Sequence, residues 1–581
     1  MIKNQQILYD LLIYLYGTPI GENVFRRLKE RLLDFQKSVN LKVNPDREAF
    51  NQEDVVLITY GDLLQRNGEA PLNTLFHFFT KYLKEFVNTI HILPFFPFSS
   101  DDGFSVIDYL KVDPNLGTWE DIRNFKKEDI RLMFDGVINH ISAESNWFQQ
   151  FLKNDPKYTQ YFITTEPDTD LSLVTRPRTL PLLTSFQTPS GKKWVWTTFS
   201  DDQIDLNFKN PDVLLDIIDV LLCYIQYGAN LIRLDAIAYL WKEIGTSCIH
   251  LPQTHAIVQL LRAILDDVAQ GVLIISETNV PHEENISYFG NGNNEAHLVY
   301  QFALPPLVAH ALLTGSAIYL TKWASELKPP SPSTSFFNFT ASHDGIGLRP
   351  VSGILPSREM EVLLRNTLEH GGKISSKTNS DGSASPYELN ITYYDLLNNP
   401  VSNEPEILQV KKFLVSQAIQ LALAGIPGIY LHNLLGSRNY TIGVEETGLP
   451  RTINRQKLEI NLVESELADK TSIRNQVFYG YSNLIKCRVS ENSFHPNGNQ
   501  QILELSTSVF SVLRTSPSGS QKILALHNLT SIQQTLEFDI NIFGNQKPKA
   551  LEDILSKKVY SIHKLMTILL EPYEIVWLKI K

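Results

Sequence analysis

The chain has 581 residues, of which 43% are hydrophobic and 20% are charged, and its formal net charge is −11 at pH 7. This composition is typical of a soluble globular protein, and the length predicts a large domain with insertions and appendages. The negative charge argues against nucleic acid or an anionic membrane as the main partner, because both bind a basic face.

The three cysteines, Cys223, Cys248 and Cys487, show no metal-ligand spacing and are too few for a disulfide framework. Near the N-terminus, the apolar run at residues 11–16 is too short for a signal-peptide core or a membrane span. We therefore expect a cytoplasmic protein, either a monomer or a homodimer, without a metal ion and without a membrane anchor.

The first part of the chain, residues 1–51, is predicted to be a separate helical extension. Apolar residues recur at helical spacing from Leu8 to Leu15 and again from Phe25 to Phe35, and Gly17-Thr-Pro19 separates the two runs. An amphipathic helix pair of this kind usually packs on a neighbour, so we expect a docking element or a partner surface rather than chemistry.

Beyond residue 52, apolar strands alternate with amphipathic helices such as 213–225 and 257–268. The eight expected strands are residues 55–60, 90–94, 130–140, 231–235, 273–277, 298–302, 336–342 and 426–430. This alternation predicts an α/β fold, a parallel (β/α)₈ barrel built from residues 52–140 and 211–490.

Three segments fall outside this alternation. Residues 141–210 are rich in Pro, Thr and Trp and are predicted to form an inserted domain after the third strand, overhanging the barrel mouth. Residues 369–386 are rich in Gly, Ser, Lys and Asn, and are expected to be a mobile lid or a solvated loop, with their place on the rim favouring the lid. Short alternating strands in residues 491–581 predict a C-terminal β-sandwich domain.

Acidic side chains stand at the carboxyl ends of three predicted strands, at Asp235, Glu277 and Asp344. In a parallel barrel these ends meet at the face where active sites lie. Cleaving a glycosidic bond with retention requires a nucleophilic carboxylate and a carboxylic acid about 5 Å apart. Arg233 can hold Asp235 ionised, because the two side chains share one face of the strand, and burial would raise the pKa of Glu277 toward that of a general acid. Each acid alone has a structural alternative, but together they predict carboxylate chemistry.

Motifs at these positions are similar to those of the α-amylase superfamily of glycoside hydrolases. They are Asp135-Gly-Val-Ile-Asn-His140, Arg233-Leu-Asp-Ala236, Glu277 and His343-Asp344. Further motifs resemble the sucrose phosphorylase subfamily: Leu93-Pro-Phe-Phe96, Asp101-Asp-Gly-Phe104, Gly245-Thr-Ser-Cys248, Phe302-Ala-Leu-Pro-Pro-Leu307, His343-Asp-Gly-Ile-Gly347 and Ile453-Asn-Arg455. The resemblance extends from about residue 52 to about residue 490.

The resemblance implies a role for each matching residue. Asp235 would be the nucleophile, Glu277 the general acid and base, and Asp344 the group that stabilises the transition state. Asp101 and Arg455 would pair and hold the far hydroxyls of the donor glucose. Phe104 would form an apolar platform, and the remaining contacts around the ring would come from His140, Arg233, Tyr239 and His343. No cofactor is implied, since inorganic phosphate is the co-substrate.

The acceptor side departs from the sucrose phosphorylases. Asn279 stands where they carry a His, and residues 97–109 and 385–390 look closer to relatives that phosphorolyse glucosylglycerate or phosphorylated sucrose. We therefore expect an anionic acceptor, glycerate before fructose 6-phosphate. Candidate cations for the phosphate or the acceptor are Arg176, Arg178, Lys373 and Lys377. The alternative for each of them is a solvated surface side chain.

The function expected from these observations is that of a retaining α-glucoside phosphorylase that forms glucose 1-phosphate by double displacement. A sucrose or sucrose 6-phosphate phosphorylase is the first alternative. A hydrolase or transglucosidase is the second, because the same carboxylates serve all of these reactions. A non-catalytic carbohydrate-binding scaffold is the remote alternative, and the complete set of acids argues against it.

Overall fold

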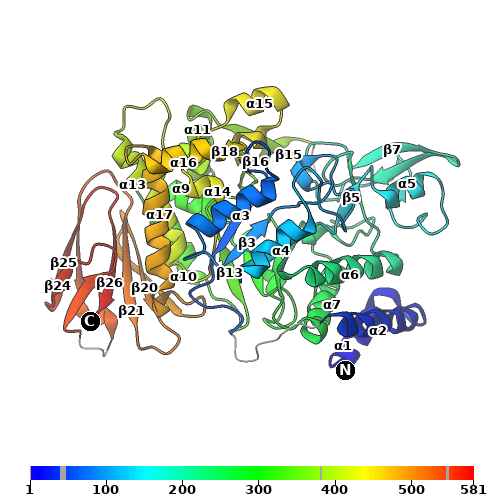
Figure 1. The fold of residues 1–581 in the computed structure, drawn as a ribbon, viewed down its shortest axis with the longest axis horizontal. Helices are drawn as coiled ribbons and strands as arrows, with labels where there is room; N and C mark the ends of the chain where they lie inside the picture. The colour runs from blue at the N-terminus through cyan, green and yellow to red at the C-terminus, as the bar shows by residue number, and fades with distance from the viewer. Residues whose placement is uncertain (1, 40–47, 380–381, 545–547) are drawn as a thin grey trace.

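The computed structural model describes residues 2–39, 48–379, 382–544 and 548–581, and a barrel forms its centre (Figure 1). In the view of Figure 1, the C-terminal strands lie to the left of the barrel and the two N-terminal helices lie at the lower right. The inserted segment projects at the upper right, beside the strand labelled β7.

Eight parallel strands close the barrel in the order β1-β17-β13-β12-β11-β10-β4-β3. Their bounds are β1 Val56–Thr59, β3 Thr89–Ile92, β4 Arg131–Gly136, β10 Ala229–Leu234, β11 Leu273–Ser276, β12 Leu298–Tyr300, β13 Ser335–Asn338 and β17 Ile426–Tyr430. Each falls within or next to a strand expected from the sequence, so the predicted α/β barrel is confirmed. Apolar runs buried on both faces produce this arrangement, because helices cover the outside of the sheet.

Helices that follow or precede these strands form the outer layer. The main ones are α3 Pro71–Tyr82, α4 Trp119–Lys127, α6 Pro211–Gln226, α7 Pro252–Val268, α9 Leu304–Thr314, α10 Ile318–Glu326, α11 Ser357–Glu369, α13 Glu406–Ala422 and α17 Ile473–Val489. The start of α6 shows why the chain turns helical there. Pro211 occupies the first turn, and the Asn210 side chain accepts the N–H of Asp212 at 3.0 Å.

The third expected strand, residues 130–140, is divided in the structure. Strand β4 ends at Gly136, and His140 begins a separate strand, β5 (His140–Ser142), which pairs antiparallel with β9 (Gln203–Asp205). The inserted segment therefore leaves and rejoins the barrel through this pair. Between them lie the helix α5 (Asn146–Leu152) and a small sheet of β6 (Thr164–Thr165), β8 (Gly191–Trp196) and β7 (Leu183–Thr188).

The expectation of a solvated loop at residues 369–386 is wrong for the described part of this segment, and its expected action as a lid stays a prediction. Helix α11 runs to Glu369, and β15 (Lys373–Thr378) pairs with β16 (Ala384–Asn390), which also pairs with β14 (Ile346–Gly347). Leu389 is fully buried and Ile374 packs on the core, so apolar side chains fix this hairpin despite its polar composition. Residues 380–381 of the expected loop lie outside the described residues.

The C-terminal part is all β. One sheet has the order β19 Asn499–Ser506, β20 Val509–Thr515, β21 Lys522–Asn528, β26 Ile575–Ile580, β23 Ala550–Asp553 and β24 Val559–Ser561, and a second pairs β22 Gln534–Asp539 with β25 Leu565–Leu570. Alternate side chains of β25 are buried, and Met566, Ile568 and Leu570 join a core that includes Leu524 and Leu526 of the larger sheet. This alternation is the pattern of a sheet with one face in a core.

The N-terminal helices α1 (Gln5–Tyr16) and α2 (Ile20–Ser38) pack on the barrel helices α6 and α7. Leu12 and Leu28 are fully buried, and Tyr16 Oη donates to the carbonyl of Phe208 at 3.0 Å. The pair thus docks on the outside of the barrel, as its amphipathic pattern predicts. Residues 40–47, which belong to the predicted extension, lie outside the described residues.

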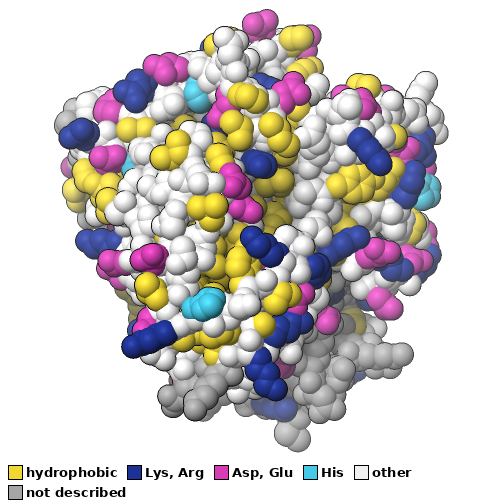
Figure 2. Space-filling model, turned by 90° about the vertical axis from the view of Figure 1, so that its left-hand side faces the viewer, with side chains coloured by type: hydrophobic (Ala, Val, Ile, Leu, Met, Phe, Trp, Pro, Cys, Tyr) yellow, Lys and Arg dark blue, Asp and Glu magenta, His cyan; other side chains and the backbone are white. Residues whose placement is uncertain are grey.

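The surface shown in Figure 2 carries acidic and basic side chains mixed together, rather than one continuous basic face. In the part of the chain that the structure describes, no helix is both long and apolar enough to cross a membrane. Within the same residues, no group of three or more His, Cys, Asp or Glu side chains is placed to hold a metal ion.

Candidate active site

A cavity opens at the carboxyl ends of the barrel strands, where active sites of this fold lie. Predicted site residues that line it are Asp101, Phe104, His140, Arg178, Asp235, Tyr239, Glu277, Asn279, His343 and Asp344. The cavity is also lined by residues that were not predicted to belong to the site: Phe199, Gln203, Ala236, Ala238, Thr278, Phe302, Tyr387 and Arg451. Several of these come from the inserted segment and from the hairpin of β15 and β16. The strand pattern of the sequence does not predict where these two segments lie.

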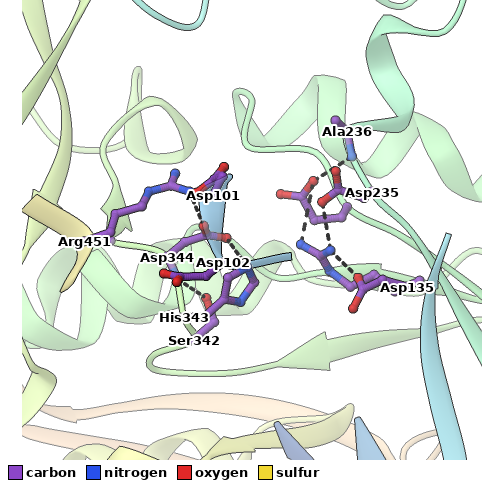
Figure 3. Close-up of polar contacts among 12 residues, drawn as sticks. Asp101, Asp102, Asp135, Asp235, Ala236, Ser342, His343, Asp344 and Arg451 are labelled. Carbon is purple, nitrogen blue, oxygen red and sulfur yellow. Dashed lines mark hydrogen bonds and ion pairs between the residues drawn. The ribbon is translucent and has the colours of Figure 1, made fainter. Parts of the chain in front are cut away.

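Asp235 follows β10 and rests on a buried arginine. Arg233 Nη1 lies 2.8 Å from Asp235 Oδ1 and 2.5 Å from Asp135 Oδ1, and Asp135 in turn lies 2.6 Å from His91 Nε2. Figure 3 shows Asp235 and Asp135 on the same side of the site. Burial raises the pKa of Asp235 to about 7, although the Arg233 guanidinium acts in the opposite direction.

Glu277 follows β11 and faces the same guanidinium from a greater distance. Its Oε2 atom accepts the N–H of Ala236 at 2.9 Å and lies 3.9 Å from Arg233 Nη2. Ala236 has a left-handed backbone conformation, with φ of +49°, which turns its N–H toward the glutamate. Burial raises the pKa of Glu277 to about 7. Because Arg233 lies closer to Asp235, the proton that the two acids share near neutral pH belongs on Glu277.

Asp344 lies across the site from Asp235, beside Arg451 (Figure 3). Arg451 Nη1 is 2.6 Å from Asp344 Oδ1, and His343 Nε2 is 3.4 Å from Asp344 Oδ2. Although burial acts to raise it, these neighbours and Arg455 hold the pKa of Asp344 well below its usual range. Asp344 therefore stays ionised while Glu277 keeps its proton. Arg451 stands four residues before Arg455 and two before the motif that contains it, and this nearness is the signal that would have pointed to it.

The expected pair of Asp101 and Arg455 is present but shared. Arg455 Nη1 lies 3.6 Å from Asp101 Oδ1, whereas Asp102 Oδ2 is closer, at 2.7 Å. Both aspartates have a left-handed backbone, so their carboxylates turn toward the same arginine. Phe104 stacks on the His343 ring with centroids 4.8 Å apart, and it forms the expected apolar wall of the cavity.

The hairpin of β15 and β16 (the rim hairpin) brings Tyr387 to the cavity and Glu388 to Arg178, on the side expected to receive the acceptor. The register between β15 and β16 shifts after Ser375, so Tyr387 has no partner on β15, while its carbonyl accepts the N–H of Leu348 at 3.0 Å. Such a bulge re-aims a side chain, and Tyr387 lines the cavity. Glu388 is 1% exposed, accepts the N–H of Gly345 at 2.6 Å and lies 3.0 Å from Arg451 Nη2.

The two glycines of the His343–Gly347 motif allow this close packing. A Cβ atom on Gly345 would lie 2.5 Å from Glu388 Cγ, and one on Gly347 would lie 2.4 Å from Asn279 Oδ1. Because Gly347 has no side chain, it leaves the space at the cavity wall that Asn279 occupies.

The four predicted acceptor cations lie in different places. Arg178 lines the active-site cavity, and its Nη1 atom is 3.8 Å from Glu388 Oε2. Arg176 and Lys377 line a neighbouring cavity instead, together with Arg349. Arg176 also donates to the carbonyl of Leu180. Among the described residues, Lys373 lines neither cavity, because it begins β15, paired with Asn390, four residues along an extended strand from Lys377.

Taken together, the barrel, the paired acids at its carboxyl face and the ionised third acid define a glycoside-processing enzyme that acts with carboxylates. The model of the α-amylase catalytic domain matches residues 80–328. The chain is 50% identical to the glucosylglycerate phosphorylase of Spirochaeta thermophila over 92% of this chain and 91% of the relative. It is 43% identical to that of Escherichia coli K12, over 99% of this chain and 100% of the relative.

A solved structure, the sucrose 6F-phosphate phosphorylase from Thermoanaerobacter thermosaccharolyticum, superimposes with a TM-score of 0.73 at 26% identity, covering 88% of this chain and 98% of that one. The chain belongs to the α-amylase family and, within it, to the group of the glucosylglycerate phosphorylases.

Proposed function

We propose that this protein is a retaining glucosylglycerate phosphorylase, which transfers glucose between glycerate and inorganic phosphate. The observation that carries the proposal is the close similarity, over nearly the whole chain, to relatives named for this activity, combined with an intact pair of acids in the cavity. The products of phosphorolysis are glucose 1-phosphate and glycerate.

Arg178 supports an anionic acceptor. It lines the cavity, and its guanidinium is 3.8 Å from Glu388, a carboxylate that Arg451 already holds at 3.0 Å. Its positive charge is therefore only partly balanced in the described part of the chain. A glycerate carboxylate, or inorganic phosphate in the second step, would complete that balance.

In the first step, a carboxylate oxygen of Asp235 attacks the anomeric carbon and the bond to the glycerate oxygen breaks. Glu277 gives its proton to the departing oxygen, so glycerate leaves with its hydroxyl restored. Arg233 holds the nucleophile at 2.8 Å, and ionised Asp344 stabilises the positive charge that develops on the sugar ring.

In the second step, an oxygen of inorganic phosphate attacks the same carbon and displaces Asp235, which is restored as a carboxylate. Glu277, now ionised, takes the proton from the attacking phosphate oxygen. Two inversions give retained stereochemistry, so the product is the α anomer of glucose 1-phosphate.

The direct test is the synthetic direction. Purified protein is incubated with glucose 1-phosphate and, in turn, glycerate, fructose, fructose 6-phosphate and glycerol, and phosphate release is measured with each. We expect glycerate to give the highest kcat/KM, with glucosylglycerate as product. A tenfold preference for fructose would contradict the proposal, and sugar release without any need for an acceptor would indicate a hydrolase.

A further inference from the structure

A second cavity, next to the active-site cavity, gathers three positive side chains from segments that are far apart in the sequence. Arg176 comes from the inserted segment, Arg349 from the short helical turn η4 (Arg349–Val351), and Lys377 from β15. Among the described residues that line this cavity there is no Asp or Glu. The reaction proposed above uses none of the three cations, so their convergence points to a separate purpose.

Little negative charge reaches these cations from the described part of the chain. Arg349 Nη2 lies 3.9 Å from Glu284 Oε2, and that oxygen is shared with His250, whose Nε2 atom is 3.1 Å away. Arg176 donates to the carbonyl of Leu180, while its Nε atom is buried and has no hydrogen-bond partner among the described residues. The positive charge of the cluster is therefore only partly balanced.

The surroundings of Lys377 contain further positive charge. Burial lowers the pKa of its ammonium group, and the guanidinium of Arg349 lowers the pKa further. No carboxylate of the described residues opposes this shift. Like charges that are held close together destabilise one another, and an anion bound between them removes that cost.

The side chains of the cavity are suited to an oxyanion such as phosphate. An arginine offers several N–H groups in one plane and binds phosphate through two parallel hydrogen bonds, and a lysine adds a compact positive charge. Thr175 and Thr378, whose hydroxyl groups can donate further hydrogen bonds, line the same cavity. Phosphate is also the multiply charged oxyanion that the proposed reaction consumes.

The second cavity adjoins the acceptor side of the active site. Arg176 precedes Arg178 by two residues, and Arg178 lines the active-site cavity. Burial raises the pKa of Tyr387, and Arg349 opposes this rise, so Arg349 lies near a tyrosine that lines the active-site cavity. An anion in the second cavity would thus lie next to the place where the acceptor reacts.

We propose that the second cavity binds inorganic phosphate through Arg176, Arg349 and Lys377, at a site separate from the one where phosphate reacts. Glycerate and phosphate react at the same carbon of the sugar, so phosphate reaches the glucosyl enzyme only after glycerate has left. A phosphate ion held in the second cavity raises the local phosphate concentration at that moment and favours phosphate over water as the acceptor. This role rests on the proposed function, whereas the binding of phosphate does not.

Phosphate binding to the free protein tests the site itself. Isothermal titration calorimetry at constant ionic strength is carried out on Arg178→Ala, which lacks the cation of the active-site cavity. We expect phosphate to bind, and Lys377→Met in this background to weaken the binding about tenfold to a hundredfold, because a charge-assisted contact is lost. Lys373→Met is the matched control, because it removes the same charge from the same strand outside the cavity, and its effect should be less than about twofold.

Each result of the titration decides the question. Absence of phosphate binding in Arg178→Ala, or equal weakening by Lys373→Met and Lys377→Met, would overturn the proposal. Arg349→Gln removes a charge that a different segment contributes, so it should weaken phosphate binding too, and it keeps the test decisive if Lys377→Met does not fold. Glycerate carries less negative charge than phosphate and should bind the same variants more weakly, and equal binding of the two would contradict the assignment to phosphate.

The fate of the glucosyl enzyme tests the role of the site. α-Glucosyl fluoride is supplied with limiting phosphate, and glucose 1-phosphate and glucose are measured together, so the ratio of the two products does not depend on the first step. We expect Lys377→Met to lower the ratio of glucose 1-phosphate to glucose about tenfold at low phosphate and less at high phosphate, while Lys373→Met leaves it unchanged. An unchanged ratio in Lys377→Met would overturn the role. If the wild type forms no glucose 1-phosphate, the proposed function fails instead, and the calorimetry still decides whether phosphate binds in the second cavity.

Discussion

The donor and acceptor sides of the cavity are built in different ways. On the donor side, Asp235 and Asp344 each lie within 3 Å of an arginine, and Arg233 belongs to a barrel strand. On the acceptor side, Arg178 comes from the inserted segment and its carboxylate neighbour, Glu388, is 3.8 Å away. Paired charges held by a rigid strand are suited to glucosyl transfer, the step that is common to every acceptor. A loop arginine whose charge is only partly balanced is suited to discriminating between acceptors.

The largest expected effect is that of Asp235→Asn on the donor side. The substitution removes the proposed nucleophile without changing the volume of the side chain, and Arg233 keeps its partner Asp135 at 2.5 Å. We expect kcat to fall about 10⁴-fold or more, with the thermal midpoint close to that of wild type. A variant that kept a tenth of wild-type activity would remove Asp235 from the nucleophile role.

The next effect, that of Glu277→Gln, depends on the leaving group. Glucosylglycerate needs a proton on the departing oxygen, whereas fluoride leaves with little protonation. We expect formation of the glucosyl enzyme from α-glucosyl fluoride to survive, measured as the burst of fluoride release, while phosphorolysis of glucosylglycerate is lost. Equal losses with both donors would show that Glu277 is not the acid.

The pH profile provides a test without a mutation. Burial raises the pKa of Glu277 to about 7, and its protonated form is the one that acts on glucosylglycerate. The kcat/KM for phosphorolysis should therefore fall above pH 7, approaching tenfold per pH unit, because the acid is progressively lost. Fluoride release from glucosyl fluoride should not show this alkaline limb, and a limb common to both donors would contradict the assignment.

Arg178→Ala tests the acceptor side, where the effect should be selective rather than general. Loss of a charge-assisted contact is worth about 1.5–3 kcal/mol, which lowers kcat/KM for glycerate about tenfold to a hundredfold. Glycerol has no carboxylate, so its kcat/KM should change little, and the two acceptors are compared with glucose 1-phosphate as donor. An equal loss for both would place Arg178 in glucosyl transfer itself.

The sequence predicted the donor side better than the acceptor side, and the reason is physical. A carboxylate that directly follows an apolar strand, such as Glu277, is placed at the barrel face by the strand itself. The eight strands were predicted for the same reason, since continuous apolar runs indicate strands buried on both faces. Asp102, which takes part of the expected role of Asp101, was missed because a left-handed backbone does not follow from residue type.

The acceptor side depends on long-range contacts that no local pattern carries. Tyr387 reaches the cavity through a bulge in the rim hairpin. On the donor side, Arg451 was missed for the same reason, because it reaches Asp344 from a short helical turn that follows the last strand of the barrel. The hairpin itself was expected to be a loop, because its glycines and serines outnumber the few apolar residues, such as Leu389, that bury it. Lys373 and Lys377 were therefore predicted as equivalent candidates, although the structure places them in different surroundings.

The smallest expected effect distinguishes these lysines. Lys373 begins β15 and is exposed, whereas Lys377, four residues further along the strand, lines the cavity next to the active site with Arg176 and Arg349. Four residues of extended strand span about 13 Å, too far for Lys373 to share an anion with Lys377. We expect Lys373→Ala to change kcat/KM for glycerate less than about twofold, as is usual for an exposed side chain. Lys373→Ala is also the matched control for Arg178→Ala. Each substitution removes one positive charge, so the two variants have the same net charge. If Lys373→Ala lowered glycerate use as strongly as Arg178→Ala, the selectivity would come from the overall positive potential of the rim, and the contrast between a placed arginine and a solvated lysine would not hold.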